Sequence, residues 1–124
     1  MKTLAVIITS PPSNHLTQTA YQIVAQAHEQ GVSVVGVFFY QSGVMNASKH
    51  LAIPNDEFPL VSKWSALSSA HNIPLYLCST AAEKHGLIIE NNPNSNELIN
   101  EEFVIAGLGE LVQLSSKANR TVQL

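Results

Sequence analysis

The only cysteine of this chain, Cys78, has the sequence surroundings of a reactive thiol. It follows an apolar run at residues 73–77 and precedes a helix-compatible run at residues 79–85, which Gly86 ends. A strand that ends in cysteine and opens directly into a helix places the sulfur where free N–H groups and the helix dipole favour an anion. The thiolate is the reactive form of cysteine. The alternative interpretation is a small, buried, inert hydrophobic residue.

Other familiar site patterns are missing or incomplete. The chain has no phosphate-binding loop ending in Gly-Lys-Ser/Thr and no Gly-x-Ser-x-Gly motif. Gly107 and Gly109 begin a dinucleotide-like pattern, but Val112 stands at its third glycine position, so a tight strand-to-helix turn is the better interpretation. The five histidines are widely spaced and there is one cysteine, so we expect no metal site and no cofactor. His85 is predicted to lie about 10 Å from Cys78, two helical turns on, and to balance the helix C-terminus with Lys84.

Composition restricts the class of protein. The 124 residues carry a net charge of −3, which gives no basic surface for direct binding of nucleic acid. Charged residues make up 12%, against roughly 25% in typical domains, which indicates either burial against partner subunits or a surface of uncharged polar residues. One cysteine cannot form an internal disulfide, and the N-terminal apolar run is too short for a signal peptide or a membrane span. We therefore expect a cytoplasmic protein without membrane contact, formed by one domain over residues 1–124.

Strand-like and helix-like segments alternate along the chain. Apolar runs predict strands over residues 4–9, 32–40, 73–77 and 103–106, with a further strand over 121–124. Helices are predicted over residues 15–30, from 57 or 58 to 71, over 79–85 and over 108–116, with a shorter one over 44–50. This alternation predicts an α/β fold of three layers, α/β/α, around a mostly parallel sheet of four to five strands, in a flavodoxin-like arrangement.

Details at the helix ends and faces follow from the same pattern. Ser13 or Asn14 is expected to cap the first helix, and Asp56 and Glu57 to cap the second, with Pro59 in its first turn. The expected apolar face of the first helix is formed by Leu16, Ala20, Ile23, Val24 and Ala27. The expected face of the last helix is formed by Leu108, Leu111, Val112 and Ser115.

Parallel strands direct their carboxyl ends to one rim of the sheet. That rim is predicted to collect residues 10–14, residues 40–46, Cys78 and Ser79, with Tyr40 lining the same crevice as the thiol. Cys78 is the only strong nucleophile there, and no histidine or aspartate is an obvious base for protease-like chemistry. Thiol–disulfide redox chemistry needs a resolving cysteine, which the chain lacks. The chemistry that remains for a solitary thiolate is to accept a sulfur atom, hold it as a persulfide and pass it on.

Several stretches, in order along nearly the whole chain, resemble the TusD/DsrE family of sulfur-relay proteins. They are VFFY at 37–40, GV at 43–44, NA at 46–47, DEF at 56–58, LV at 60–61 with Trp64, residues 73–78 with AA at 81–82 and Gly86, GLG at 107–109 and RTVQ at 120–123. The family carries its sulfur-accepting cysteine after the third strand, ahead of an alanine-rich helix, and Cys78 stands at that position. The helix that follows is less basic than in relatives, since Glu83 accompanies Lys84 and His85.

The resemblance implies a DsrE-like sulfurtransferase, with Cys78 as the catalytic residue that forms a cysteine persulfide. It implies a place in the relay that makes 2-thiouridine at the wobble position of certain tRNAs, and closest similarity to the TusD subunit of a TusBCD complex. It further implies a heterohexamer with TusB-like and TusC-like subunits, a TusA-like sulfur donor and a TusE-like sulfur acceptor. Such a protein would meet tRNA only indirectly, in agreement with its acidic charge.

Three alternatives remain open at this point. A DsrE-type protein would carry sulfur in oxidative sulfur metabolism. A non-catalytic scaffold subunit of the same complex would depend on its interfaces, with residues such as Phe39 or Trp64, more than on its thiol. A flavodoxin-like binder would use the loop at Pro11 and Pro12 as its cofactor site.

Overall fold

The structure is a computed structural model that describes residues 2–88 and 95–124. Within these residues, five strands form one sheet in the order β4-β3-β2-β1-β5, and every pair of neighbours is parallel. The strands are β1 (Thr3–Ile8), β2 (Ser33–Phe39), β3 (Leu75–Cys78), β4 (Phe103–Ala106) and β5 (Arg120–Gln123). The prediction of a mostly parallel sheet of four to five strands is confirmed, including the last strand.

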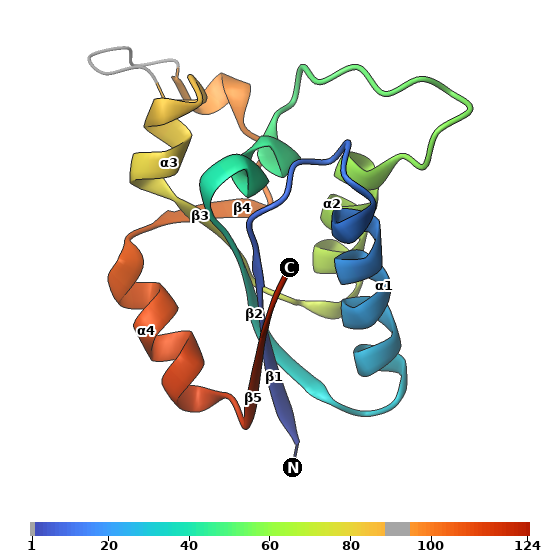
Figure 1. The fold of residues 1–124 in the computed structure, drawn as a ribbon, viewed down its shortest axis with the longest axis vertical. Helices are drawn as coiled ribbons and strands as arrows, with labels where there is room; N and C mark the ends of the chain where they lie inside the picture. Colours follow the sequence, from blue (N-terminus) through green and yellow to red (C-terminus); the bar gives the residue numbers. More distant parts are fainter. Residues whose placement is uncertain (1, 89–94) are drawn as a thin grey trace.

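Helices cover both faces of this sheet (Figure 1). α1 (His15–Glu29) and α2 (Leu60–His71) lie on one face, and α4 (Leu108–Lys117) lies on the other. Successive strands from β1 to β4 advance in one direction, whereas β5 returns to the far side of β1. Right-handed crossovers therefore place α4 opposite α1 and α2. The predicted α/β/α fold is confirmed.

Shorter helices lie above the carboxyl ends of the strands. The 3₁₀ helix η1 (Gln41–Ala47) follows β2, α3 (Ser79–Lys84) follows β3, and a second 3₁₀ turn, η2, spans Ser95–Leu98. Figure 1 shows η1 and α3 near each other at this end of the sheet, and the two elements pack together. No helix among the described residues is long and apolar enough to cross a lipid bilayer.

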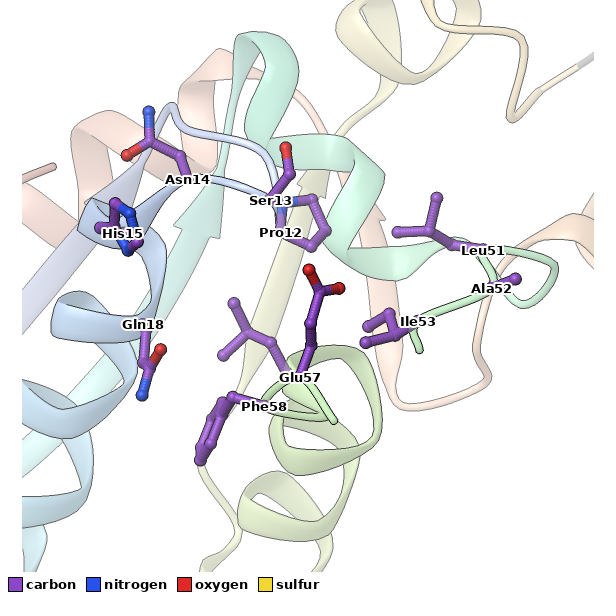
Figure 2. Close-up of a pocket in the computed structure, with 11 residues that line it drawn as sticks. Pro12, Ser13, Asn14, His15, Gln18, Leu51, Ala52, Ile53, Glu57 and Phe58 are labelled. Carbon is purple, nitrogen blue, oxygen red and sulfur yellow. The ribbon is translucent and has the colours of Figure 1, made fainter. Parts of the chain in front are cut away.

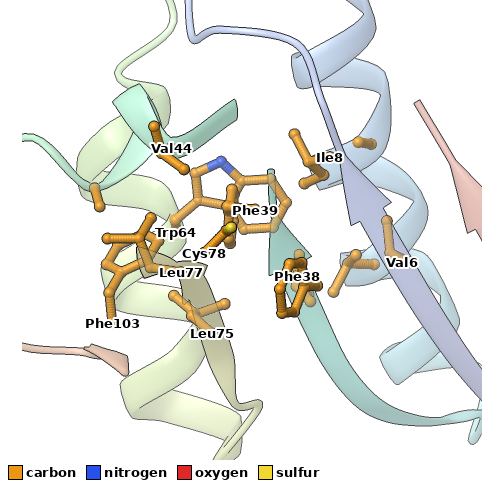
Figure 3. Close-up of a cluster of buried hydrophobic side chains, with 14 of the residues drawn as sticks. Val6, Ile8, Phe38, Phe39, Val44, Trp64, Leu75, Leu77, Cys78 and Phe103 are labelled. Carbon is orange, nitrogen blue, oxygen red and sulfur yellow. The ribbon is translucent and has the colours of Figure 1, made fainter. Parts of the chain in front are cut away.

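The core lies mainly between the sheet and the α1–α2 layer. Phe39 and Trp64 have no exposed surface, and their rings meet edge to face with centroids 5.2 Å apart. Phe103 adds a second such contact to Phe39, at 5.1 Å. Figure 3 shows this aromatic group beside Leu77 and Cys78, so the thiol lies at the border between the core and the rim. Aromatic pairs of this geometry contribute about 0.5–1.5 kcal/mol each beyond burial of their area.

The ends of α1 follow the sequence closely, whereas the start of α2 does not. The side chain of Asn14 caps α1 by accepting a hydrogen bond from the Leu16 N–H at 2.9 Å. α2 begins at Leu60 rather than at residue 57 or 58, with Pro59 at the cap position and no side-chain cap. A proline disfavours helical backbone in the residue before it, so Phe58 cannot continue the helix. The predicted capping by Asp56 and Glu57 is therefore wrong.

The buried face of α4 also differs from the prediction. Leu114 is the buried residue of α4, while Leu108 and Val112 are 50% and 64% exposed. Leu114 fills the space above Gly36 in β2, where a Cβ would lie only 2.8 Å from its side chain. Leu16, expected on the apolar face of α1, is likewise exposed. The rest of the predicted α1 face is confirmed, since Ala20 and Val24 are buried and Ile23 and Ala27 pack against the core. Spacing of three and four residues thus predicted the buried face of α1 but not that of α4.

Candidate functional site

Cys78 is the last residue of β3 and also the cap residue of α3. Its backbone is extended (φ −64°, ψ 120°), and helical backbone starts at Ser79, so the strand opens into the helix without an intervening loop. Parallel pairing with Ala106 of β4 fixes the position of Cys78 in the sheet. The predicted placement of the cysteine at the junction of strand and helix is confirmed.

The thiol lines a cavity of about 450 Å³ at the carboxyl end of the sheet. Cys78 itself is only 2% exposed, so a reacting molecule reaches it through this cavity. The walls come from the end of β2 and the start of η1, from α3 and its end, and from the first turn of α4. The lining residues are Tyr40, Gln41, Ser42, Cys78, Thr80, Ala81, Lys84, His85 and Leu108.

The thiol cavity contains some of the residues that the sequence placed at this rim. Tyr40 and Cys78 share the cavity, as predicted, whereas residues 10–14 and Ser79 do not line it. The sequence did not predict five further lining residues: Thr80, Ala81, Lys84, His85 and Leu108. The sequence placed Leu108 on the apolar face of its helix. The turn at residues 107–109, which contains Leu108, indicates that α4 starts directly after β4 and therefore at the same rim.

Two basic side chains, Lys84 and His85, line this cavity, and no carboxylate among residues 2–88 and 95–124 does. His85 is the C-terminal cap residue of α3, and its N–H donates to the Ala81 carbonyl at 3.0 Å. The predicted position of Lys84 and His85 at the C-terminal end of this helix is confirmed. The Lys84 ammonium gives the cavity a positive group that attracts anionic sulfur species.

The segment that walls the cavity opposite α3 approaches β1 very closely. The Tyr40 N–H donates to the Ile8 carbonyl at 2.9 Å, and the Gly43 N–H donates to the Tyr40 carbonyl at 2.9 Å. A Cβ on Gly43 would collide with the carbonyl of Ile8, so only glycine fits. Between them, Gln41 has a φ of 51°, which turns the chain sharply after β2. This turn directs Gln41 and Ser42 toward the thiol cavity.

A second cavity, of about 260 Å³, lies on the other side of the rim and shares no lining residue with the first. Figure 2 shows the Glu57 carboxylate between the loop at Pro12 and Ser13 and the segment at Ile53. This is the loop that a flavodoxin-like binder would use. Its surroundings include a carboxylate, which opposes the binding of a phosphate there.

The described residues also bear on metal binding. Among residues 2–88 and 95–124, no three His, Cys, Asp or Glu side chains lie close enough together to hold a metal ion. The expectation that the protein uses no metal stays a prediction.

Comparison with known proteins shows which family this chain belongs to. The sequence profile of the DsrE/DsrF-like family matches residues 1–124, and the chain belongs to this family. The fold agrees, because the crystal structure of the YchN protein from E. coli superimposes with a TM-score of 0.78 over 100% of this chain and 99% of that one, at 21% identity. The predicted family and fold class are confirmed.

The curated relatives are sulfurtransferases by name. The chain is 40% identical over 111 residues to the sulfurtransferase TusD homolog of Vibrio parahaemolyticus, covering 86% of this chain and 84% of that protein. It is 33% identical over 126 residues to sulfurtransferase TusD of Proteus mirabilis, covering 98% and 97%. It is 31% identical over 126 residues to the putative sulfurtransferase DsrE of Allochromatium vinosum, with the same coverage. The predicted class, a sulfurtransferase of a sulfur relay, is confirmed at this level.

Proposed function

We propose that this protein carries sulfur as a persulfide on Cys78, in the relay that 2-thiolates the wobble uridine of tRNA. The observation that supports this most strongly is the site itself. The only thiol of the chain lies at the rim of a parallel sheet, in a cavity lined by Lys84 and His85 and by no carboxylate of the described residues. The 33–40% identity to proteins named TusD favours the tRNA relay over other uses of the same chemistry.

The proposed transfer is a thiol exchange without net oxidation. The Cys78 thiolate attacks the outer sulfur of a donor persulfide, R–S–SH. A new S–S bond forms at Cys78, the S–S bond of the donor breaks, and the donor leaves as its thiolate, R–S⁻. The acceptor thiolate then attacks the outer sulfur of the Cys78 persulfide and regenerates the Cys78 thiolate. The Lys84 ammonium, which lines the cavity, stabilises the anionic sulfur at each stage.

The partners follow from the same proposal. Residues 1–124 form one sulfurtransferase domain that assembles in the cytoplasm with TusB-like and TusC-like subunits into a heterohexamer. A TusA-like protein delivers sulfur, and a TusE-like protein takes it to the modifying enzyme. The chain has no direct role in holding tRNA, which agrees with its net charge of −3.

Intact-protein mass spectrometry tests the proposal directly. The complex is incubated with a cysteine desulfurase, its TusA-like carrier and cysteine. The wild-type chain is expected to gain about 32 Da, reversibly by dithiothreitol, because one sulfur atom adds to a thiolate. The Cys78→Ser chain is expected to gain nothing. A wild-type chain that stays unmodified within the complete complex contradicts persulfide transfer through Cys78.

A second candidate function is supported by a specific similarity. The identity of 31% to the putative sulfurtransferase DsrE of Allochromatium vinosum extends over 126 residues, and it supports a DsrE-type sulfur carrier in oxidative sulfur metabolism as the second candidate. Deletion of the gene separates the two functions. Loss of 2-thiouridine from cellular tRNA is expected for the first, whereas unchanged tRNA with impaired sulfur oxidation indicates the second.

Assembly with companion subunits predicts the effect of a surface substitution. Val104 of β4 and Leu108 and Val112 of α4 are all at least half exposed, and we propose that they form one apolar patch, which we call the α4–β4 patch. Large exposed apolar residues of this kind typify subunit interfaces. Val112→Glu is expected to weaken co-purification with TusB-like and TusC-like subunits by about 2 kcal/mol or more, measured by size-exclusion chromatography.

Leu16→Glu provides the matched control for this patch. Leu16 is 49% exposed in the first turn of α1, on the other side of the sheet. It should leave assembly unchanged, and both variants should unfold at the wild-type temperature. A complex that forms normally with Val112→Glu contradicts the assignment of the α4–β4 patch as an interface.

A further inference from the structure

Asn46 makes a buried polar connection between three segments of the fold. Its side chain has no exposed surface. The amide Nδ2 donates to the carbonyls of Gly43, at 2.9 Å, and Ser10, at 3.2 Å. The carboxamide oxygen accepts from the indole N–H of Trp64 at 3.2 Å. One side chain thus joins η1, the loop after β1 and α2.

Two of these hydrogen bonds join η1 to residues that other contacts also hold in place, Ser10 and Trp64. Ser10 is itself buried, and its hydroxyl lies 2.6 Å from that of Thr17 in α1. Trp64 is packed against Phe39 and Tyr21, with ring centroids 5.2 Å away in both cases. The Asn46 carboxamide therefore attaches η1 to two rigid neighbours. An apolar residue of similar size would leave two carbonyls and one indole N–H without these partners.

The attached element is the wall of the thiol cavity. Gln41 and Ser42, at the start of η1, line the cavity with Cys78, and η1 packs against α3, which carries the other wall. Asn46 does not line the cavity. The Gly43 carbonyl, which accepts a hydrogen bond from Asn46, belongs to the residue after Ser42. A displacement of η1 at Gly43 would therefore also move Ser42 in the cavity wall.

We infer that Asn46 is a positioning residue for sulfur transfer at Cys78. It touches no sulfur, but it holds η1 so that Gln41 and Ser42 close the cavity around the thiol. The inference rests on the proposed persulfide function of Cys78. Loss of the Asn46 bonds would open the cavity to small reagents and would misplace the wall that aligns an incoming persulfide. Small reagents should consequently reach the thiol faster, whereas the rate of sulfur transfer should fall.

The test compares two rates in Asn46→Ala and in a destabilised control. Val24→Ala is the control, because Val24 is fully buried in α1 and does not line the cavity. For Asn46→Ala we expect alkylation of Cys78 by iodoacetamide to accelerate about tenfold through local opening. We expect the single-turnover rate of sulfur transfer within the saturated donor complex to fall about tenfold or more, because small misplacements in such sites are costly.

The control separates positioning from general loss of stability. In Val24→Ala, both rates should stay within about twofold of wild type at temperatures well below unfolding. If Asn46→Ala does not fold, Asn46→Ser serves instead, since its hydroxyl can still donate to one carbonyl. Hydrogen exchange of the backbone amides at residues 41–47 should be faster in the Asn46 variant than in the control.

The outcomes distinguish this inference from the proposed function. If the wild-type chain takes up no sulfur on Cys78, the proposed function fails, whatever Asn46 does. If the wild type is loaded but the Asn46 variants match Val24→Ala in both rates, the inference on Asn46 is overturned. It is also overturned if alkylation and transfer fall together, since a wall that loosens should admit iodoacetamide faster.

Discussion

Cys78→Ser is expected to abolish sulfur transfer and to leave the fold intact. A serine hydroxyl is not ionised at neutral pH and cannot hold a persulfide, so transfer should fall by more than about 10³-fold, as when other enzymes lose their nucleophile. The measurement is the transfer of ³⁵S from a TusA-like donor through the complex to a TusE-like acceptor. Binding of both partners should remain, because the substitution changes one atom inside the cavity.

The local geometry explains why the serine variant should fold. Cys78 is the cap residue of α3, and its side chain makes no capping hydrogen bond. Serine is a preferred residue at this position and contributes about 1 kcal/mol there. This gain offsets much of the cost of burying a hydroxyl, about 1–3 kcal/mol when it lacks a partner. Cys78→Ala, without a hydroxyl, controls for the difference and should be equally inactive.

Retained transfer in either variant would contradict the role of Cys78. The scaffold interpretation would then be favoured, in which activity depends on the interfaces of this subunit. Under that interpretation, Val112→Glu should abolish activity while Cys78→Ser does not. The two substitutions therefore assign the protein to one of the two roles.

Gly43→Ala is the second substitution with a large expected effect. The new Cβ would collide with the carbonyl of Ile8, which also accepts a hydrogen bond from the Tyr40 N–H. Backbone atoms of a central strand cannot move aside as a flexible side chain can, so we expect a loss of about 3 kcal/mol or more in the free energy of unfolding. Urea denaturation followed by Trp64 fluorescence measures it, since Trp64 is the only tryptophan.

The same change at another glycine is the control. A Cβ on Gly109, in the first turn of α4, meets no atom within 4 Å. Gly109→Ala is expected to be neutral or to stabilise the protein by up to about 1 kcal/mol, because alanine favours helix over glycine. A Gly43→Ala protein as stable as Gly109→Ala would show that η1 is not pressed against β1 as described.

The sequence predicted best what depends on neighbouring residues. Continuous apolar runs identified the inner strands β1, β2 and β3, which are covered on both sides, and the helix boundaries near Asn14 and Gly31 follow local rules. Cys78 could be placed because a strand and a helix meet at it. Tyr40 could be placed because parallel strands end at one rim.

The parts that the sequence did not predict depend on distant residues. The buried side of α4 is decided by the space above Gly36, almost eighty residues earlier in the chain. The position of Leu108 in the thiol cavity depends on how the crossover from β4 returns over the sheet. The bonds of Asn46 join residues up to 36 positions apart, and no local pattern indicates them.

The place of β5 has a consequence for the synthesis of the protein. β1 lies between β2 and β5, so the first strand made is completed only by the last one, through pairs such as Val6 with Val122. The Thr9 N–H and the Leu124 carbonyl continue this pairing at 3.1 Å. During translation, one edge of β1 must stay open until residues 120–124 leave the ribosome. An unpaired strand edge invites association with other chains, so we expect the nascent chain to be most prone to misassociation before these last residues emerge.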